Sequence, residues 1–302
     1  MAVPSFGAAT TMPSEENDEP AAAGGGKNMV HNKQGIDMLH GRIWTKVLRF
    51  ALPVAATGIL EQLFNASGIM IVGNFSQSDG TAAVAAVGSN APVTGLILNL
   101  FIGIALGANV VIANAIGRGS REAVRNAVHT SIVTALIGGV IVAIIGELLA
   151  GPLLGMLNVT ADVFPLALAY LRIYLIGMPV ILLYNFETAI FRSVGDTQAP
   201  LAVLAISGVL NVTVGLIFVV LFHWGVSGVA TATVIANVVS SMILLYRLVH
   251  TDAAIHVDLR EFGIDWFTLR QILHIGLPAG VQSAVFAVAN IIIQAAINSL
   301  GT

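Results

Sequence analysis

The 302-residue sequence contains no cysteine, which excludes disulfides, thiol catalysis and cysteine-based metal sites. Charge is almost as scarce, because Asp, Glu, Lys and Arg together make up 10% of the residues, against about 25% in typical soluble domains. From Thr197 to Tyr246 none of these four residue types occurs. A surface this apolar would aggregate in water, whereas it is the composition that a lipid bilayer requires.

Hydrophobic residues are abundant instead, at 56% of the sequence. A helix needs about 20 apolar residues to cross a hydrocarbon core about 30 Å thick. The apolar windows therefore predict seven spans, at approximately 50–75, 86–112, 128–149, 164–185, 199–222, 226–246 and 271–298. Continuous apolar runs such as Ile141–Ile145 lack the alternation of a β-barrel strand. The predicted fold class is an all-α polytopic membrane protein.

The sequence predicts four regions along the chain. Residues 1–36 are acidic and low in complexity, which predicts a disordered cytoplasmic tail. A six-helix amino-terminal lobe is expected over 37–249 and a cytoplasmic inter-lobe linker over 250–270. Leu52-Pro53 recurs as Leu277-Pro278 at the start of the seventh span. This faint repeat suggests that 271–302 is the first helix of an incomplete second lobe in parallel orientation.

The basic residues predict the orientation of the spans. Twelve of the thirteen Lys and Arg residues lie before the first span or in every second connection after it. Excess positive charge marks the cytoplasmic side, so we expect the amino terminus in the cytoplasm and the protein in the cytoplasmic (inner or plasma) membrane. The thirteenth, Arg172, lies in the outer half of the fourth span, where we expect it to snorkel to the interface. Glu147, near the outer end of the third span, is also expected to be interfacial.

Several short segments, taken in order, resemble the multidrug and toxic compound extrusion (MATE) family. They include Phe50–Pro53, Leu63–Ala66, Tyr184–Phe186, Arg192–Thr197 and Gly276–Gly280. The resemblance extends over about 45–302. It implies a twelve-helix efflux antiporter that expels organic, often cationic, compounds in exchange for H⁺ or Na⁺, by alternating access between two six-helix lobes. On that resemblance the chain is apparently truncated after the seventh helix.

The sequence departs from the family pattern where coupling carboxylates or amides are expected. Gly68 and Gly215 stand at positions that often hold an acid or an amide in the family. A carboxylate allows protonation and Na⁺ binding to compete for one charge. Glu61 is the only acid in the first span, and Asn65 follows it one helical turn later on the same face. We therefore interpret Glu61 as the source of the missing charge, with a structural hydrogen-bonding role, protonated at neutral pH, as the alternative.

Amides supply the other candidates. Asn185 and Asn211 match motif positions of the family, and with Glu61 and Asn65 they are the predicted cation-coupling residues. Asn290, Gln294 and Asn298 are spaced four residues apart along the seventh span and are predicted to line the substrate cavity. Helix packing is the alternative role of all these amides.

An acid at a helix end and a pair of glycines give two further predictions. Glu187, at the cytoplasmic end of the fourth span, is expected to be a solvated rim charge, with a gate pair to Arg192 as the alternative. Gly103 and Gly107 form a GxxxG pattern, which predicts close helix packing.

No enzyme motif, metal-ligand spacing or nucleic-acid-binding cluster occurs in the sequence. The predicted function is multidrug efflux, with H⁺ or Na⁺ as the coupling ion, no other cofactor, and small organic substrates and the bilayer as partners. One alternative is a non-transporting remnant or membrane interaction module, with self-association left open if the chain ends at Thr302. The other is a lipid-linked oligosaccharide flippase, which would need a strongly cationic cavity.

Overall fold

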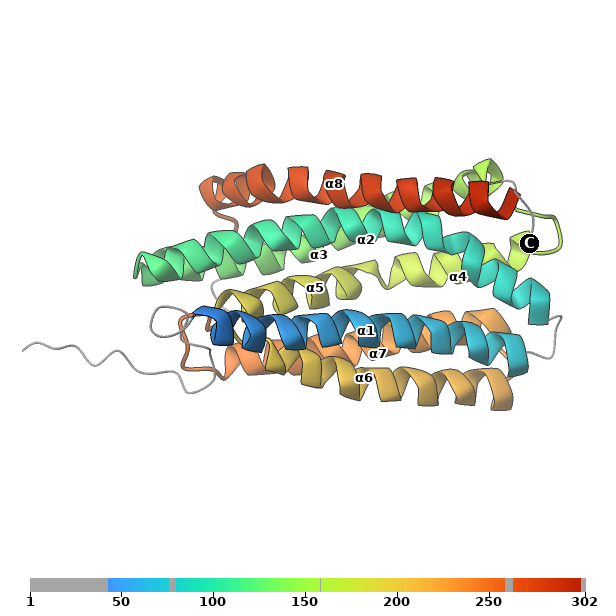
Figure 1. Ribbon diagram of the computed structural model, residues 1–302, viewed down its shortest axis with the longest axis horizontal. Helices are drawn as coiled ribbons and strands as arrows, with labels where there is room; N and C mark the ends of the chain where they lie inside the picture. Colours follow the sequence, from blue (N-terminus) through green and yellow to red (C-terminus); the bar gives the residue numbers. More distant parts are fainter. Residues whose placement is uncertain (1–42, 76–79, 158, 259–262, 300–302) are drawn as a thin grey trace, which may run out of the picture. The chain divides into compact units, whose positions relative to one another are not determined.

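The computed structural model describes residues 43–75, 80–157, 159–258 and 263–299. Within this part the regular structure is entirely helical (Figure 1). The helices are α1 Ile43–Phe75, α2 Gly80–Gly117, α3 Arg121–Met156, α4 Phe164–Ile176, α5 Met178–Ser193, α6 Gln198–Leu216 with a π-helical continuation η1 Ile217–Leu221, α7 Gly225–Val249 and α8 Trp266–Ser299. The predicted tail over 1–36 lies outside the described residues.

Six of the described helices are long and apolar enough to cross a membrane, and the pair α4 and α5 makes a seventh candidate span with a bend of 53°. Each of the seven predicted spans overlaps one of these candidates. The prediction of an all-α polytopic membrane protein is confirmed, because its hydropathy signal depends only on local composition.

The fourth span differs from its predicted limits. It is broken between α4 and α5, where Pro179 cannot donate a backbone hydrogen bond to the preceding turn. The break is tightly packed, since a Cβ on Gly139 of α3 would lie 2.3 Å from the Cα of Pro179. Beyond it α5 continues to Ser193. The predicted end at 185 is therefore wrong, because the residues that follow Asn185 remain packed in the bundle.

The described helices pack against one another in a connected bundle. Helix α1 packs against α6 and α7, and α5 packs against α2, α3 and α7. Part of the predicted linker joins this core, because Ile255 and Val257 are 2% and 0% exposed. The N–H of Val257 donates to the carbonyl of Leu248 in α7 at 3.1 Å. The segment before α8 is thus anchored to the end of α7.

Helix α8 lies along α2, and four glycines bring the two backbones together (Figure 1). A Cβ on Gly103 would lie 2.1 Å from the Cα of Gly280, and one on Gly107 would lie 2.7 Å from the N of Gly276. Rising numbers on α2 meet falling numbers on α8, so the helices are antiparallel. We call these four glycines the α2–α8 seam. The packing prediction for Gly103 and Gly107 is confirmed.

Arg172 in α4 is paired with Glu147 in α3, with 2.9 Å between Nε and Oε1. Their side chains are 52% and 39% exposed. Exposed pairs of this kind contribute roughly 0–1 kcal/mol. The geometry is that of a structural contact between two helices, in keeping with the snorkelling interpretation of Arg172.

Candidate functional site

A cavity of about 170 Å³ lies among helices α1, α2, α4, α5, α6 and α7. All four predicted cation-coupling residues, Glu61, Asn65, Asn185 and Asn211, line it. The other polar lining residues are Tyr174, Tyr184, Ser207, Thr233, Asn237 and Ser240, and the apolar ones include Phe64, Leu98, Ile102, Ile181, Leu204 and Ala236. The structure therefore brings together lining residues that lie up to 179 positions apart in the sequence, from Glu61 to Ser240. We call this space the Glu61 cavity.

Glu61 is the one acidic side chain that lines this cavity within the described part of the chain. It precedes Asn65 by one helical turn on α1, so both side chains point the same way. The guanidinium of Arg192, in the last turn of α5, acts on Glu61 by electrostatic attraction. No Lys or Arg lines the cavity within the described part of the chain. A cationic molecule in the cavity would thus meet one carboxyl group, that of Glu61, with one positively charged side chain, Arg192, nearby.

Hydrogen bonds orient two of the cavity amides. Nδ2 of Asn185 donates to the carbonyl of Ile181 at 2.8 Å, and Nδ2 of Asn237 donates to the carbonyl of Thr233 at 2.9 Å. Each amide nitrogen is thereby occupied by its own helix, which leaves Oδ1 as the acceptor. Oxygen acceptors are the ligands that hard cations prefer. Together with Glu61 they form an arrangement suited to a small cation or a proton.

Sequence reasoning missed several polar lining residues. Thr233, Asn237 and Ser240 follow one another at helical spacing on one face of α7. That pattern was visible as a polar stripe in an uncharged span. Tyr174 and Tyr184 gave no comparable signal, because single tyrosines in apolar helices are also common at membrane interfaces.

The volume of the Glu61 cavity limits what it can hold. Sites for drug-sized molecules usually measure about 300–1,000 Å³, and this cavity is smaller, at about 170 Å³. It has room for an ion with some water. It is too small to hold a drug-sized molecule by itself.

Gly68 and Gly215, which stand where the family often has an acid or an amide, do not line this cavity. A Cβ on Gly68 would lie 3.2 Å from Cγ1 of Val229, and one on Gly215 would lie 3.5 Å from Cδ1 of Ile71. Both positions face apolar side chains of neighbouring helices. A carboxylate there would lie outside the set of groups that surrounds Glu61.

The expectation of a solvated rim charge at Glu187 is wrong. This side chain is 0% exposed, and neither carboxylate oxygen makes a well-formed hydrogen bond among the described residues. The reason is that α5 continues past the predicted end of the span and packs against α2, α3 and α7. The alternative gate pair is not seen either, since Arg192 acts on Glu61 and Tyr184.

The third predicted group lies on α8. Asn290, Gln294 and Asn298 all fall within this helix, but their side chains lie outside the described part of the structure. Their assignment to the substrate cavity stays a prediction.

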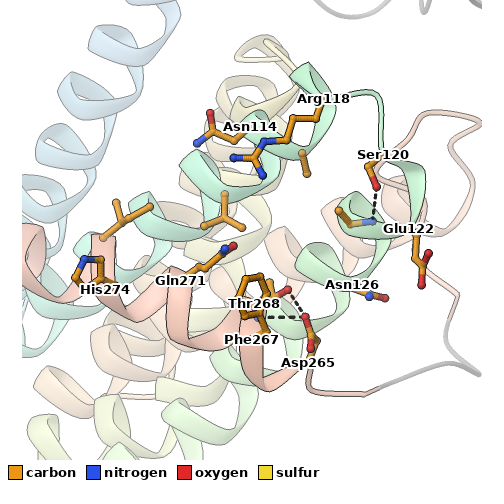
Figure 2. A pocket seen from close by; sticks show the side chains of 14 residues that line it. Asn114, Arg118, Ser120, Glu122, Asn126, Asp265, Phe267, Thr268, Gln271 and His274 are labelled. Atoms are coloured by element: carbon orange, nitrogen blue, oxygen red, sulfur yellow. Dashed lines mark hydrogen bonds between the residues drawn. The ribbon is translucent and has the colours of Figure 1, made fainter.

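A second cavity, of about 460 Å³, lies where the end of α2 meets the beginnings of α3 and α8 (Figure 2). Its lining includes charged side chains of both signs, Arg118, Glu122 and Asp265, and the imidazole ring of His274. It has room for an organic molecule, but its lining selects no single charge. None of the predicted site residues borders it.

Asp265 caps the start of α8 at this second cavity. Its Oδ2 accepts hydrogen bonds from the hydroxyl of Thr268 and, at 3.1 Å, from the main-chain N–H of Thr268 (Figure 2). These bonds hold the pKa of the Asp265 carboxyl below its usual range, with the hydroxyl contributing most. The cap fixes the point at which the chain enters α8.

Comparisons with known proteins agree with this architecture. The MatE family pattern matches residues 53–217, more than half of the chain. The chain is 27% identical over 267 residues to a Bacillus subtilis protein named probable multidrug resistance protein YoeA, covering 86% of this chain and 57% of that protein.

Solved structures of the family share the fold. An outward-facing conformation of a multidrug resistance MATE family transporter matches with a TM-score of 0.76 and 27% identity, over 85% of this chain and 56% of that one. An inward-facing conformation matches with a TM-score of 0.70 and 26% identity, over 80% and 55%. The chain thus spans little more than half the length of these proteins. It belongs to the MatE family, whose members are transporters rather than enzymes.

Proposed function

We propose that this chain belongs to a multidrug efflux antiporter, which exports organic, often cationic, compounds in exchange for H⁺ or Na⁺ by alternating access between two helical lobes. The observation that carries this proposal is the Glu61 cavity, in which one carboxylate is grouped with amide and hydroxyl oxygens inside a membrane-spanning bundle. The names of the relatives, a probable multidrug resistance protein and multidrug resistance transporters, support it.

The chemistry of coupling follows from competition for one charge. A proton neutralises Glu61, whereas Na⁺ would be held by its carboxylate together with Asn65, Asn185 and Asn211. Either ion favours the conformation in which the cavity is closed around it, by no more than its difference in affinity between the two states. A cationic substrate would leave when that conformation is populated.

The substrate needs more room than the Glu61 cavity provides. We propose that Asn290, Gln294 and Asn298 contribute to that larger site, which lies between the lobes. The lack of Lys and Arg around the Glu61 cavity, in the part of the chain that is described, favours cationic substrates and disfavours the flippase alternative, for which a cationic cavity is required.

The membrane and the orientation are also part of the proposal. We place the protein in the cytoplasmic membrane with its amino terminus in the cytoplasm, because its basic residues gather on one side of the spans. The cavity in Figure 2 would then open on the cytoplasmic side.

The test is efflux of a fluorescent organic cation from cells that lack their own multidrug pumps. Glu61→Gln keeps the shape of the side chain and removes its charge. We expect efflux to fall about tenfold, within the range typical of coupling between two ligands. Asp162→Asn, an exposed acid in the outer connection, is the matched control and should leave efflux unchanged. Equal efflux by Glu61→Gln and the unaltered protein at every pH would refute the role of Glu61.

A further inference from the structure

Glu187 is a buried acid that the Glu61 cavity does not use. It is 0% exposed and borders none of the described cavities. Neither of its oxygens is satisfied by a well-formed hydrogen bond within the described part of the chain, and the Ser241 hydroxyl of α7 is the side-chain donor that acts on it. Native structures rarely leave a buried polar side chain without partners, so such a group calls for a specific explanation.

The same face of α5 holds two other buried polar groups. Tyr184 and Thr188 are 6% and 5% exposed, and their hydroxyls lie close enough to act on each other, although neither makes a well-formed hydrogen bond among the described residues. Positions 184, 187 and 188 share one helical face. Ser241 of α7, which is 3% exposed, lies opposite Glu187. A line of polar groups therefore leads from Tyr184 into the bundle.

Tyr184 connects this line to the functional site. Its side chain lines the Glu61 cavity, and it interacts electrostatically with both Glu61 and Glu187. A tyrosine hydroxyl both donates and accepts hydrogen bonds. Tyr184 therefore belongs both to the wall of the Glu61 cavity and to the face of α5 that carries Glu187.

The neighbouring helices offer Glu187 little countercharge. Helix α2 contains no titratable side chain, and neither does α6. Helix α7 contributes Tyr246 and Arg247 only in its last two turns. Arg192, the other charged residue on α5, acts on Glu61 and Tyr184.

Helix α3 contributes the remaining titratable groups near the cytoplasmic side. These are Arg121, Glu122, Arg125 and His129. Both ring nitrogens of His129 are engaged, one with the carbonyl of Arg125 at 3.0 Å and the other with the main chain of Asp258. None of these groups is among those that act on Glu187.

These surroundings suit a proton better than a metal cation. An ionised carboxylate buried without a countercharge is strongly disfavoured, so burial favours the neutral carboxylic acid in this conformation. A hard cation would need a shell of oxygen ligands and the space to hold them. A proton needs neither, since it forms one O–H bond with a carboxylate oxygen.

We propose that Glu187 is an internal proton site of the transporter, which receives a proton from the Glu61 cavity past the Tyr184 hydroxyl and releases it toward the cytoplasm. The step is a reversible protonation of one carboxylate oxygen and involves no redox change. Glu187 lies six residues before the end of α5, about 9 Å along the helix axis. Its proton can leave only when α5 and α7 separate enough to admit water, so release is coupled to conformation. This inference rests on the proposed function and names the proton as the coupling ion.

The primary test is infrared spectroscopy on the purified protein, read at neutral pH. We expect a carboxylic acid C=O band that persists in Glu61→Gln and disappears in Glu187→Gln. If Glu187→Gln does not fold, Glu187→Asp should keep an acid band at a shifted frequency. The absence of a protonated carboxyl band that depends on position 187 would overturn the proposal. This measurement does not depend on transport.

The second test is efflux driven by a pH gradient in vesicles, with binding of the fluorescent cation measured in parallel. Glu187→Gln, which resembles the protonated acid, should bind the cation as the unaltered protein does and lose at least about 90% of the pH-driven efflux, a tenfold change. If the band is present but Glu187→Gln responds to pH normally, the coupling role is refuted. If the unaltered protein exports nothing, the proposed function fails, while the band still decides whether Glu187 holds a proton.

Discussion

The α2–α8 seam and the Glu61 cavity both depend on glycine, but the atoms that the glycines meet are different. In the seam a Cβ on Gly103 would collide with the backbone of Gly280, 2.1 Å away. In the cavity a Cβ on Gly208 of α6 would collide with the ring of Phe64, 1.8 Å from Cζ. A side chain can rotate away, whereas a helix backbone can respond only by moving the whole helix. The shorter distance therefore belongs to the more adaptable contact.

This difference divides the molecule into a rigid part and an adjustable part. The seam holds α8 to α2 through backbone contact at its four glycines. The cavity is bounded by side chains from six helices and can change shape as those side chains move.

The largest effect is expected in the seam. Gly103→Ala forces α2 and α8 apart, and we expect a loss of about 3 kcal/mol in unfolding free energy, the upper end of typical overpacking costs. Thermal unfolding in detergent measures it. Gly95→Ala is the matched control on the same helix, since nothing lies within 4 Å of its added Cβ. Because Ala favours helix over Gly, the control should be neutral or more stable. Equal stability of the two variants would show that the seam is not tight.

A smaller effect on stability is expected in the cavity. Gly208→Ala displaces the Phe64 ring, which lines the Glu61 cavity, so we expect a cost of about 1 kcal/mol together with reduced efflux. Gly215→Ala is the control, because its added Cβ would make ordinary contacts at 3.5 and 3.7 Å. Thermal unfolding and efflux should be measured on both variants. If Gly208→Ala lost as much stability as Gly103→Ala, the distinction between adjustable and rigid contacts would be wrong.

The smallest effect concerns the start of α8. The pKa of Asp265 is lowered by its hydrogen bonds with Thr268, so its cap stabilises the protein above the ordinary pKa of an aspartate and is lost as the pH falls through the folded-state value. We expect the thermal midpoint to fall slightly on acidification below about pH 4, and Asp265→Asn to remove that part of the decrease. Asp252→Asn, in the exposed part of the linker, should leave the decrease unchanged. An identical acid profile for Asp265→Asn would contradict the assignment.

The candidate residues show which inferences a sequence supports. Glu61 and Asn65 were predicted together because their spacing on one helix fixes their common face. Asn185 and Asn211 were predicted from the family resemblance, and the structure brings them to the same cavity. Their role in ion coupling stays a prediction. Asn237 was missed, since an amide that repeats on an apolar helix has packing as an equally good explanation.

Glu187 shows where sequence reasoning reached its limit. An acid near a predicted helix end beside Arg192 is usually solvated. Whether Glu187 is solvated depends on how far α5 continues and on which helices pack against α5. Neither property is encoded within a few residues of Glu187. Helix α5 continues to Ser193 and packs against α2, α3 and α7, which are distant from it in the sequence.

By itself the sequence determined that this chain crosses a bilayer, approximately where each span lies, and that Glu61 and Asn65 face the same direction. These properties follow from hydropathy and helical period, which act within a single helix. Only the tertiary structure decided that α8 lies against α2, that residues from six helices form one cavity, and that Glu187 is buried. Burial and contact depend on neighbours distant in the sequence, because only packing brings those atoms together.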